Sequence, residues 1–405
     1  MIDQFIKILL VILFVCSIIM GCQTNKQTIK QISYTDNPVY HYARGMKLIL
    51  ENDINNANAK INRALQLNNN HAPSIAAKSL IYAIKSLQSV KVTHINIRKS
   101  NKKRALQYLK QAIQKVDNTL TSFIVHVTAI RVYTILKNEK WLKKAVKSYQ
   151  IAINKKINSS QLPYYKNIKA ADFFIGIAYM EAHKFKEATI NFSNVLMARD
   201  CAMWKLKADQ LLKKTQCIVH ASKGFTLSKI AGKIAVKNSV TRADVSMLLI
   251  HELKIEKLNT NFFSKHKDFN TIKNVPLDII NHPFKNEIST IISLKIRGLS
   301  PVFETVNKTF AFNPQKNITR KEFALILEDI LIKLTDNQSL ATSMLGMESS
   351  PFNDVKQNTP WFNAIMIVTN RNLMENDLNG DFRPDDPVDG ASLLLAIFKL
   401  RQRSQ

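Results

Sequence analysis

Two short motifs in the chain combine residue types that can bind an acidic ligand. Thr241-Arg242-Ala243-Asp244 and Thr319-Arg320-Lys321-Glu322 each place an arginine between a hydroxyl residue and an acid, at the start of an apolar run. A guanidinium presents a planar fork of N–H donors that matches a carboxylate, which a lysine does not. Threonine followed three residues later by an acid is also a helix capping box. The motifs therefore predict two helix starts, in which the arginines either contact a ligand or only pair with the neighbouring acid.

Residue sets typical of catalysis or of metal binding do not occur in this sequence. The nine histidines are scattered singly, and we find no H-E-x-x-H, C-x-x-C, G-x-S-x-G or glycine-rich phosphate loop. The stretch from Asp377 to Asp381 resembles a calcium loop, but its glycine is fourth where an EF-hand needs it sixth, and Val388 is at position twelve. We therefore predict no enzyme activity, no metal and no cofactor.

The four cysteines fall into two groups. Cys16 and Cys22 belong to the N-terminal apolar segment, so Cys201 and Cys217 are the only thiols in the body of the chain. In an oxidising compartment an even pair can form a disulfide. We expect either a Cys201–Cys217 disulfide, which requires the chain to fold back between them, or two free buried thiols.

The first 21 residues have the pattern of a secretory signal. Lys7 precedes an apolar run of about twelve residues, which is short for a membrane span of ~20 residues. The run ends in Gly21-Cys22, which resembles the lipobox of bacterial lipoproteins. That resemblance implies removal of residues 1–21, a lipid on Cys22 and, because Gln23 is not Asp, an outer-membrane anchor facing the periplasm in a two-membrane host. The alternative is an uncleaved N-terminal anchor. Either way the rest of the chain lies outside the cytoplasm.

Composition favours helices and anionic partners. The 405 residues are 46% hydrophobic yet include only nine glycines and eleven prolines, fewer than a strand-rich fold with many turns needs. The formal charge of +28 favours contact with anionic lipids and acidic wall polymers, and an exported chain meets these before nucleic acid. The alternative interpretation is that these charges only keep the protein surface solvated. The same two interpretations, solvation or a lipid or glycan contact, apply to the basic cluster at 98–104.

Residues 23–37 are a polar tether, and a helical repeat follows over 38–217. One apolar stripe with spacing i, i+4, i+7, i+8 occurs four times, beginning at Ala57, Ala105, Ala145 and Ala188. The repeats resemble the tetratricopeptide repeat (TPR), with Gly45 and Gly176 at its small-residue positions and Tyr133 as a departure. The resemblance implies a superhelix that holds an unidentified protein or peptide. A non-repetitive helical bundle is the alternative.

Residues 218–405 contain a second recurring pattern. Phe312-Asn313-Pro314 stands six residues before Ile318, as Phe382-Arg383-Pro384 does before Val388, and upstream of the latter come Phe352-Asn353-Asp354 and Trp361. This set resembles the S-layer homology (SLH) domain in three degenerate copies, at about 218–258, 267–335 and 349–403. The resemblance implies an α-rich, three-pronged module that binds peptidoglycan or wall polysaccharide in grooves between its prongs.

The SLH resemblance also assigns the glycan-binding residues. In the family the arginine and acid of the helix-start motif line the grooves, which gives Arg242, Asp244, Arg320 and Glu322, and Trp361 joins them from the third copy. The third copy has Asp389-Gly390 where threonine and arginine are expected. The resemblance therefore implies at most two competent grooves.

Together these patterns predict a mainly α protein, with a TPR-like superhelix followed by an SLH module. We expect a non-catalytic envelope lipoprotein that tethers a membrane to the wall and recruits a protein partner. The alternatives are an assembly factor for outer-membrane or secretion machinery, acting through the repeats, and an activator that presents a wall hydrolase to its substrate.

Overall fold

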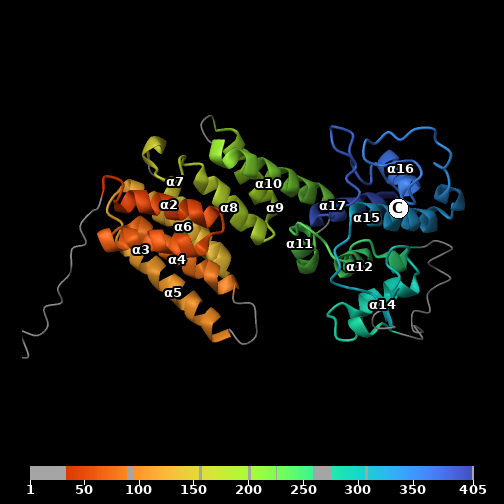
Figure 1. Cartoon of the computed structure of the whole chain (residues 1–405), viewed down its shortest axis with the longest axis horizontal. Coiled ribbons are helices and arrows are strands. Elements are labelled where there is room, and N and C mark those ends of the chain that lie inside the picture. The colour runs from red at the N-terminus through yellow and green to blue at the C-terminus, as the bar shows by residue number, and fades with distance from the viewer. Residues whose placement is uncertain are drawn as a thin grey trace, which may run out of the picture. The chain divides into compact units, whose positions relative to one another are not determined.

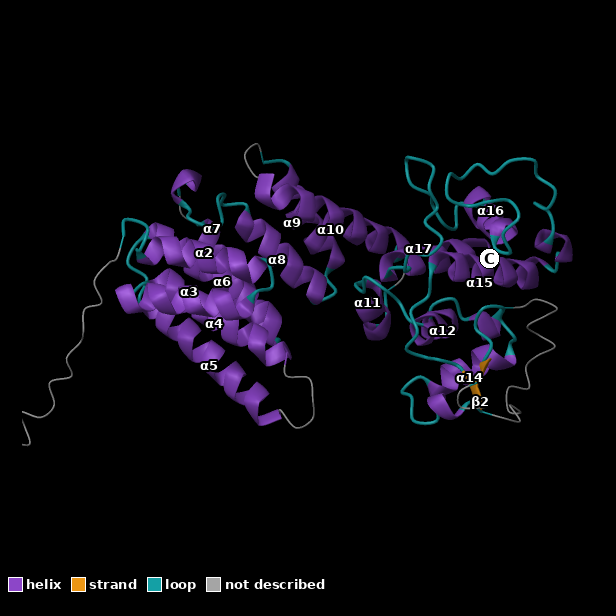
Figure 2. Cartoon of the chain, in the orientation of Figure 1, coloured by secondary structure: helices purple, strands orange, loops and turns teal. Residues whose placement is uncertain are grey.

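The computed structural model describes residues 33–88, 95–154, 157–198, 202–224, 226–258, 275–305 and 309–403 (Figure 1). Helices dominate these residues, which confirms the predicted mainly α class. The one sheet among them is the antiparallel pair β1 (Val302–Glu304) and β2 (Thr309–Ala311) (Figure 2). The predicted signal, Cys22 and the first part of the tether lie outside the described residues.

The chain forms two compact units. Unit 1 comprises residues up to Leu136 together with Asn154–Lys166, and unit 2 comprises Lys137–Ile153 together with all residues from Asn167. The helices of unit 1 are α2 (Pro38–Leu50), α3 (Ile54–Leu67), α4 (Ala72–Gln88), α5 (Ile95–Gln114), α6 (Thr119–Leu136) and the 3-10 turn η2 (Ser159–Gln161). Those of unit 2 are α7 (Trp141–Ile153), α8 (Ala170–Glu181), α9 (Phe185–Leu196), α10 (Ala202–Ala221), α11 (Lys229–Ala235), α12 (Arg242–His251), η3 (Ile255–Lys257), η4 (Leu277–Ile279), α14 (Lys285–Ser293), α15 (Arg320–Thr335), η5 (Gln338–Ala341), α16 (Phe362–Asn370) and α17 (Gly390–Arg403).

Small residues of the predicted repeat lie where paired helices cross. The alanines that begin the four stripes are all fully buried. A Cβ on Gly45 of α2 would lie 2.7 Å from Ile61 of α3, and one on Gly176 of α8 would lie 2.7 Å from Phe192 of α9. Each glycine is sixteen residues before the large side chain that fills its space. The α2–α3 and α8–α9 pairs therefore share one packing arrangement.

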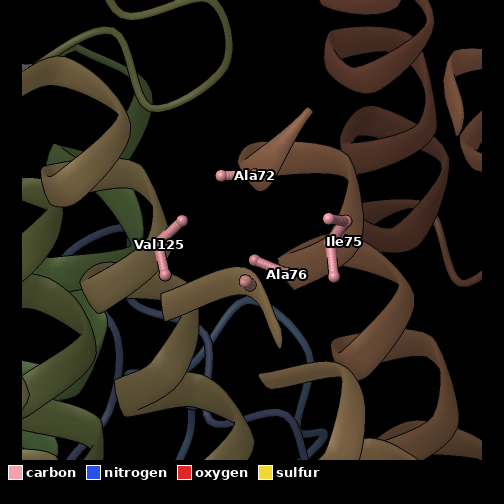
Figure 3. Close-up of a cluster of buried hydrophobic side chains, with 5 residues drawn as sticks. Ala72, Ile75, Ala76 and Val125 are labelled. Carbon is pink, nitrogen blue, oxygen red and sulfur yellow. The ribbon is translucent and has the colours of Figure 1, made fainter. Parts of the chain in front are cut away.

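The core of unit 1 is built in the same way around α4. Ala72, Ile75 and Ala76 of α4 pack with Ala112 of α5 and Val125 of α6 (Figure 3). Alanines at this crossing allow the three helices to approach closely, and the larger residues Leu65, Tyr108 and Val116 flank the cluster. α6 is apolar and long enough to span a membrane, but 67% of its apolar window is buried in the fold, as in a core helix.

The third predicted helix pair differs from the others. Its first helix, α6, belongs to unit 1 and its second, α7, to unit 2. This is the pair in which Tyr133 replaces the small residue expected at the crossing. The superhelical arrangement of a TPR array stays a prediction.

Helix α10 bears on two sequence-based expectations. The predicted boundary between residues 217 and 218 falls inside this continuous helix, which packs against both α9 and α17. Cys217 is a free thiol, and burial raises its pKa. Cys201, the other residue of the predicted disulfide, lies outside the described residues.

Candidate functional site

Three short segments, each preceding a helix, meet in a closed ring of hydrogen bonds in unit 2. The amide of Val240 donates to Val388 O (2.9 Å), that of Val388 donates to Ile318 O (3.0 Å), and that of Ile318 donates to Val240 O (3.0 Å). These residues stand directly before the motifs that open α12, α15 and α17. The ring therefore brings the starts of the three helices together, although about 70 to 80 residues separate them in the chain.

The two threonine–acid pairs form the predicted capping boxes. The Thr241 hydroxyl accepts from the Asp244 amide while Asp244 accepts from the Thr241 amide, and Thr319 and Glu322 do the same at α15. Each acid also binds a lysine, Lys237 for Asp244 (2.7 Å) and Lys316 for Glu322 (2.8 Å). Burial alone would raise the pKa of Glu322, but the bonds from Lys316 and Thr319 lower it below its usual value. Both acids are thus occupied by intramolecular partners.

Arg242 is closed off from solvent. Its side chain is buried at 6% exposure, and its Nε, Nη1 and Nη2 donate to the backbone oxygens of Phe312, Gly298 and Ser300. The guanidinium stacks on the Phe312 ring, 4.6 Å from its centroid. Burial lowers the pKa of Arg242. The expectation that Arg242 and Asp244 contact a glycan does not fit this burial, because Arg242 joins α12 to the 298–312 segment and Asp244 caps α12 and pairs with Lys237.

Arg320 occupies the corresponding position at α15 but is less enclosed. Its Nε donates to Phe382 O (2.7 Å) and its Nη2 donates to Glu375 O (2.6 Å), while the guanidinium stacks 4.6 Å from the Phe382 centroid. Nη1 makes no hydrogen bond to any described residue. Desolvation is the main reason that the pKa of Arg320 is lowered. One donor edge of this arginine therefore remains for a ligand.

A small cavity of about 80 Å³ adjoins Arg320. Its charged lining consists of Arg320, Glu375 and Lys399, and the Lys399 ammonium lies 3.5 Å from a Glu375 oxygen. Since one water needs only about 10–15 Å³, the cavity has room for a group the size of a carboxylate. With two cations and one acid, it favours an anionic group.

Two aspartates hold the turns on which the arginines stack. Asp354 accepts from the amides of Phe382 (2.9 Å) and Arg383 (2.6 Å). Asp278 accepts in the same way from Phe312 (3.1 Å) and Asn313 (2.6 Å). The sequence pattern Phe352-Asn353-Asp354 identified Asp354, but the sequence analysis missed Asp278. The spacing could have revealed it, because Asp278 stands six residues before Phe284 and Asp354 stands seven residues before Trp361.

Trp361 lies at the start of α16, as Phe284 does at the start of α14. Its ring is covered by Lys321, whose ammonium is 4.4 Å from the ring centroid and also binds Asp385. Trp361 is half-buried. Its aromatic face is therefore already engaged by a cation of the chain.

The glycine that replaces arginine in the third motif has a structural reason. A Cβ on Gly390 would overlap the carbonyl oxygen of Ile234, the penultimate residue of α11. Lys214 of α10 donates to Val236 O (2.8 Å) and Lys237 O (3.1 Å) just after that helix. Helix α11 thus fills the space that an arginine side chain would need at position 390.

Comparison with known families bears on the region around this site. Residues 351–393 match the S-layer homology domain family. They contain Asp354, Trp361, Phe382 and Gly390, and lie within the third predicted copy. No curated protein and no solved structure matches the chain. The SLH domain is a non-catalytic module that binds cell-wall components, so this protein associates with the cell envelope. Within the described residues, no group of three or more His, Cys, Asp or Glu is arranged to hold a metal.

Proposed function

We propose that this protein is a non-catalytic, lipid-anchored envelope tether that binds peptidoglycan or wall polysaccharide through a three-copy SLH module. The hydrogen-bond ring among Val240, Ile318 and Val388 supports three related copies, since it joins equivalent residues. The matching aspartate caps at Asp278 and Asp354 support the second copy. The first copy is reduced, because α11 leads almost directly into α12.

The groove beside Arg320 is the proposed glycan site. The observation that carries this assignment is that Arg320, whose Nη1 bonds no described residue, and Lys399 line the same cavity. An acidic substituent on a glycan would receive a charge-assisted hydrogen bond from the guanidinium. In this proposal Glu322 caps α15, and the ring of Trp361 holds the ammonium of Lys321. Both residues therefore position the side chains around the groove. Of the two motif arginines, Arg320 is the one with a guanidinium nitrogen that bonds no described residue, since Arg242 uses Nε, Nη1 and Nη2.

The membrane end of the tether is the lipid proposed on Cys22. A triacylated cysteine exceeds the two-signal minimum for stable anchoring, since each buried methylene adds about 0.8 kcal/mol. Gln23 favours the outer membrane of a two-membrane host, which places the module in the periplasm facing the wall.

A protein partner has a candidate site in unit 2. The first turn of α9, the end of α10 and the start of α11 line a cavity of about 1110 Å³. Phe185, Val219 and Leu227 contribute apolar surface, and the charged lining includes Lys184, Lys186, Lys223 and Lys229 against Glu187. This chemistry fits an acidic peptide segment. The alternative function, an assembly factor for outer-membrane or secretion machinery, would use this cavity without wall binding.

Sedimentation with purified sacculi tests the proposal on the full mature chain. Arg320→Lys keeps the charge but loses the fork, and we expect wall affinity to fall roughly tenfold or more, as for loss of a ~1.5–3 kcal/mol charged hydrogen bond. Arg242→Lys is the matched control, because it removes the same motif residue from a buried position. We expect it to lower the melting temperature without weakening wall binding of the folded protein.

Three outcomes decide between the functions. Wild-type binding by the Arg320→Lys variant would reject the groove, and equal losses in both variants would assign the effect to stability. If the unaltered chain does not sediment with sacculi, the assembly-factor function is favoured. Repeating the assay at 1 M salt, where the Debye length is about 3 Å, removes attraction from bulk charge.

A further inference from the structure

Helix α5, which packs against α4, carries positive charge that no acidic residue of either helix balances. The two helices pack against each other, and neither contains an acidic residue. α5 alone has six basic residues: Arg98, Lys99, Lys102, Lys103, Arg104 and Lys110. Among the described residues none of these six forms an ion pair with an acid. Since unpaired charges of one sign raise the local potential, this surface attracts anions more strongly than the chain's average charge implies.

The first half of α5 is helical and exposed. Its buried residues, Ala105, Leu109 and Ala112, all belong to the second half. Every residue from Ile95 to Ser100 is exposed, and so are Lys103 and Arg104. Lys99 and Lys103 stand four residues apart and therefore share one face of the helix. The basic cluster at 98–104 is thus part of an ordered helix with no covering element described.

Large apolar side chains are exposed in the same place. Ile95 is 50% exposed and Ile97 is 52% exposed in the first turn of α5, and Leu87 is 49% exposed near the end of α4. Ile95 stands four residues before Lys99 and eight before Lys103, so it lies on the same face of the helix as these lysines, whereas Ile97 lies on the opposite side. An exposed apolar side chain beside lysines is unfavourable in water and is typical of helices lying in the interface of a bilayer. An acidic polysaccharide would neutralise the lysines but offers no apolar phase for Ile95.

We propose that the first half of α5, with the end of α4, is a contact surface for an anionic lipid bilayer. Lys99 and Lys103 would lie among lipid phosphates, and Ile95, on the same face of the helix, would enter the upper acyl region. Such a contact would hold unit 1 against the membrane independently of the lipid proposed on Cys22. It does not depend on wall binding.

Vesicle binding by the chain from residue 23, which lacks the lipid, tests this surface. The vesicles are phosphatidylethanolamine with or without phosphatidylglycerol. We expect binding only with phosphatidylglycerol, and at least about a tenfold loss of affinity in Lys99→Glu/Lys103→Glu. The matched control is Lys143→Glu/Lys147→Glu on α7, which has the same spacing, exposure and charge change. We expect it to weaken binding less than about threefold.

A second variant separates insertion from charge attraction. Ile95→Asn leaves the charge unchanged, and we expect it to weaken binding several-fold and to make the remainder more sensitive to salt. Ile97→Asn, on the opposite side of the helix, is its control and should weaken binding less than about twofold. Equal losses in the two lysine pairs would overturn the proposal in favour of bulk charge, and an unaffected Ile95→Asn variant would overturn insertion. If Lys99→Glu/Lys103→Glu loses binding to sacculi but keeps binding to vesicles, the surface contacts the wall and the proposal is wrong.

Discussion

Arg242 and Arg320 show how the same residue in the same motif has two different roles. Both stack on the phenylalanine of an F-x-P turn and donate to its carbonyl. Arg242 uses three nitrogens on backbone oxygens and is buried, whereas Arg320 uses two and borders a cavity. The donor count and the burial, more than the motif, distinguish a structural arginine from a candidate ligand contact.

His71 is a residue whose burial predicts a pH dependence. It binds Ser74 Oγ (2.7 Å), and desolvation lowers its pKa to about 4. In the unfolded chain its pKa is about 6.5, so as pH falls below that value the unfolded state binds a proton that the folded state does not. The stability contributed by neutral His71 is therefore complete above about pH 6.5 and is lost progressively towards pH 4.

We expect His71→Gln to flatten this part of the stability profile. The measurement is the urea midpoint of unit 1 at several pH values between neutral and acidic, followed by hydrogen exchange of α4. His220→Gln, at an exposed position, is the control and should leave the slope as in the unaltered chain. A slope unchanged by His71→Gln would mean that other groups cause the acid sensitivity.

At the scale of elements, close crossings decide which positions require glycine. At Gly45 and Gly176 the neighbour is a side chain that can shift, but at Gly390 it is the backbone of α11. A flexible neighbour yields at modest energy, whereas a backbone oxygen moves only if its helix moves.

We expect Gly390→Ala to destabilise unit 2 by more than about 3 kcal/mol, since α11 or α17 must move. Gly45→Ala should cost about 1–3 kcal/mol, part of which Ile61→Val should restore because it removes the nearest methyl. A double-mutant cycle of the free energy of unfolding measures the coupling between residues 45 and 61. Strict additivity would contradict the close crossing.

At the scale of the whole molecule, the proposed attachments lie on different parts of the chain. The proposed wall site lies in unit 2, the proposed bilayer surface in unit 1, and the proposed lipid at Cys22. Several weak contacts on one chain raise the overall avidity without any single tight site.

The lipid attachment is tested by Cys22→Ser. We expect the variant to keep residues 1–21 and to incorporate no labelled fatty acid, because Cys22 is the thiol at the end of the apolar run. Cys16→Ser, inside the run, is the control and should be labelled as usual. Fatty-acid incorporation into Cys22→Ser at the normal level would contradict the anchor.

The sequence by itself determined the features that depend on nearby residues. The mainly α class, the starts of α12 and α15 and the burial of the repeat alanines all follow from spacings of three to eight residues. Capping boxes and apolar stripes are local, since their hydrogen bonds and faces form within one or two helical turns. The SLH pattern of the third copy was also readable because its motif residues keep their order and spacing.

Only the tertiary structure decided the features that join distant segments. The carbonyls that enclose Arg242 are 56 to 70 residues away, the amides capped by Asp278 are 34 and 35 residues away, and α11 meets Gly390 across more than 150 residues. The continuity of α10 through the expected domain boundary depends on its packing against α9 and α17. Burial and donor use at these positions are set by which surfaces meet when the chain folds, and a linear pattern does not specify those partners.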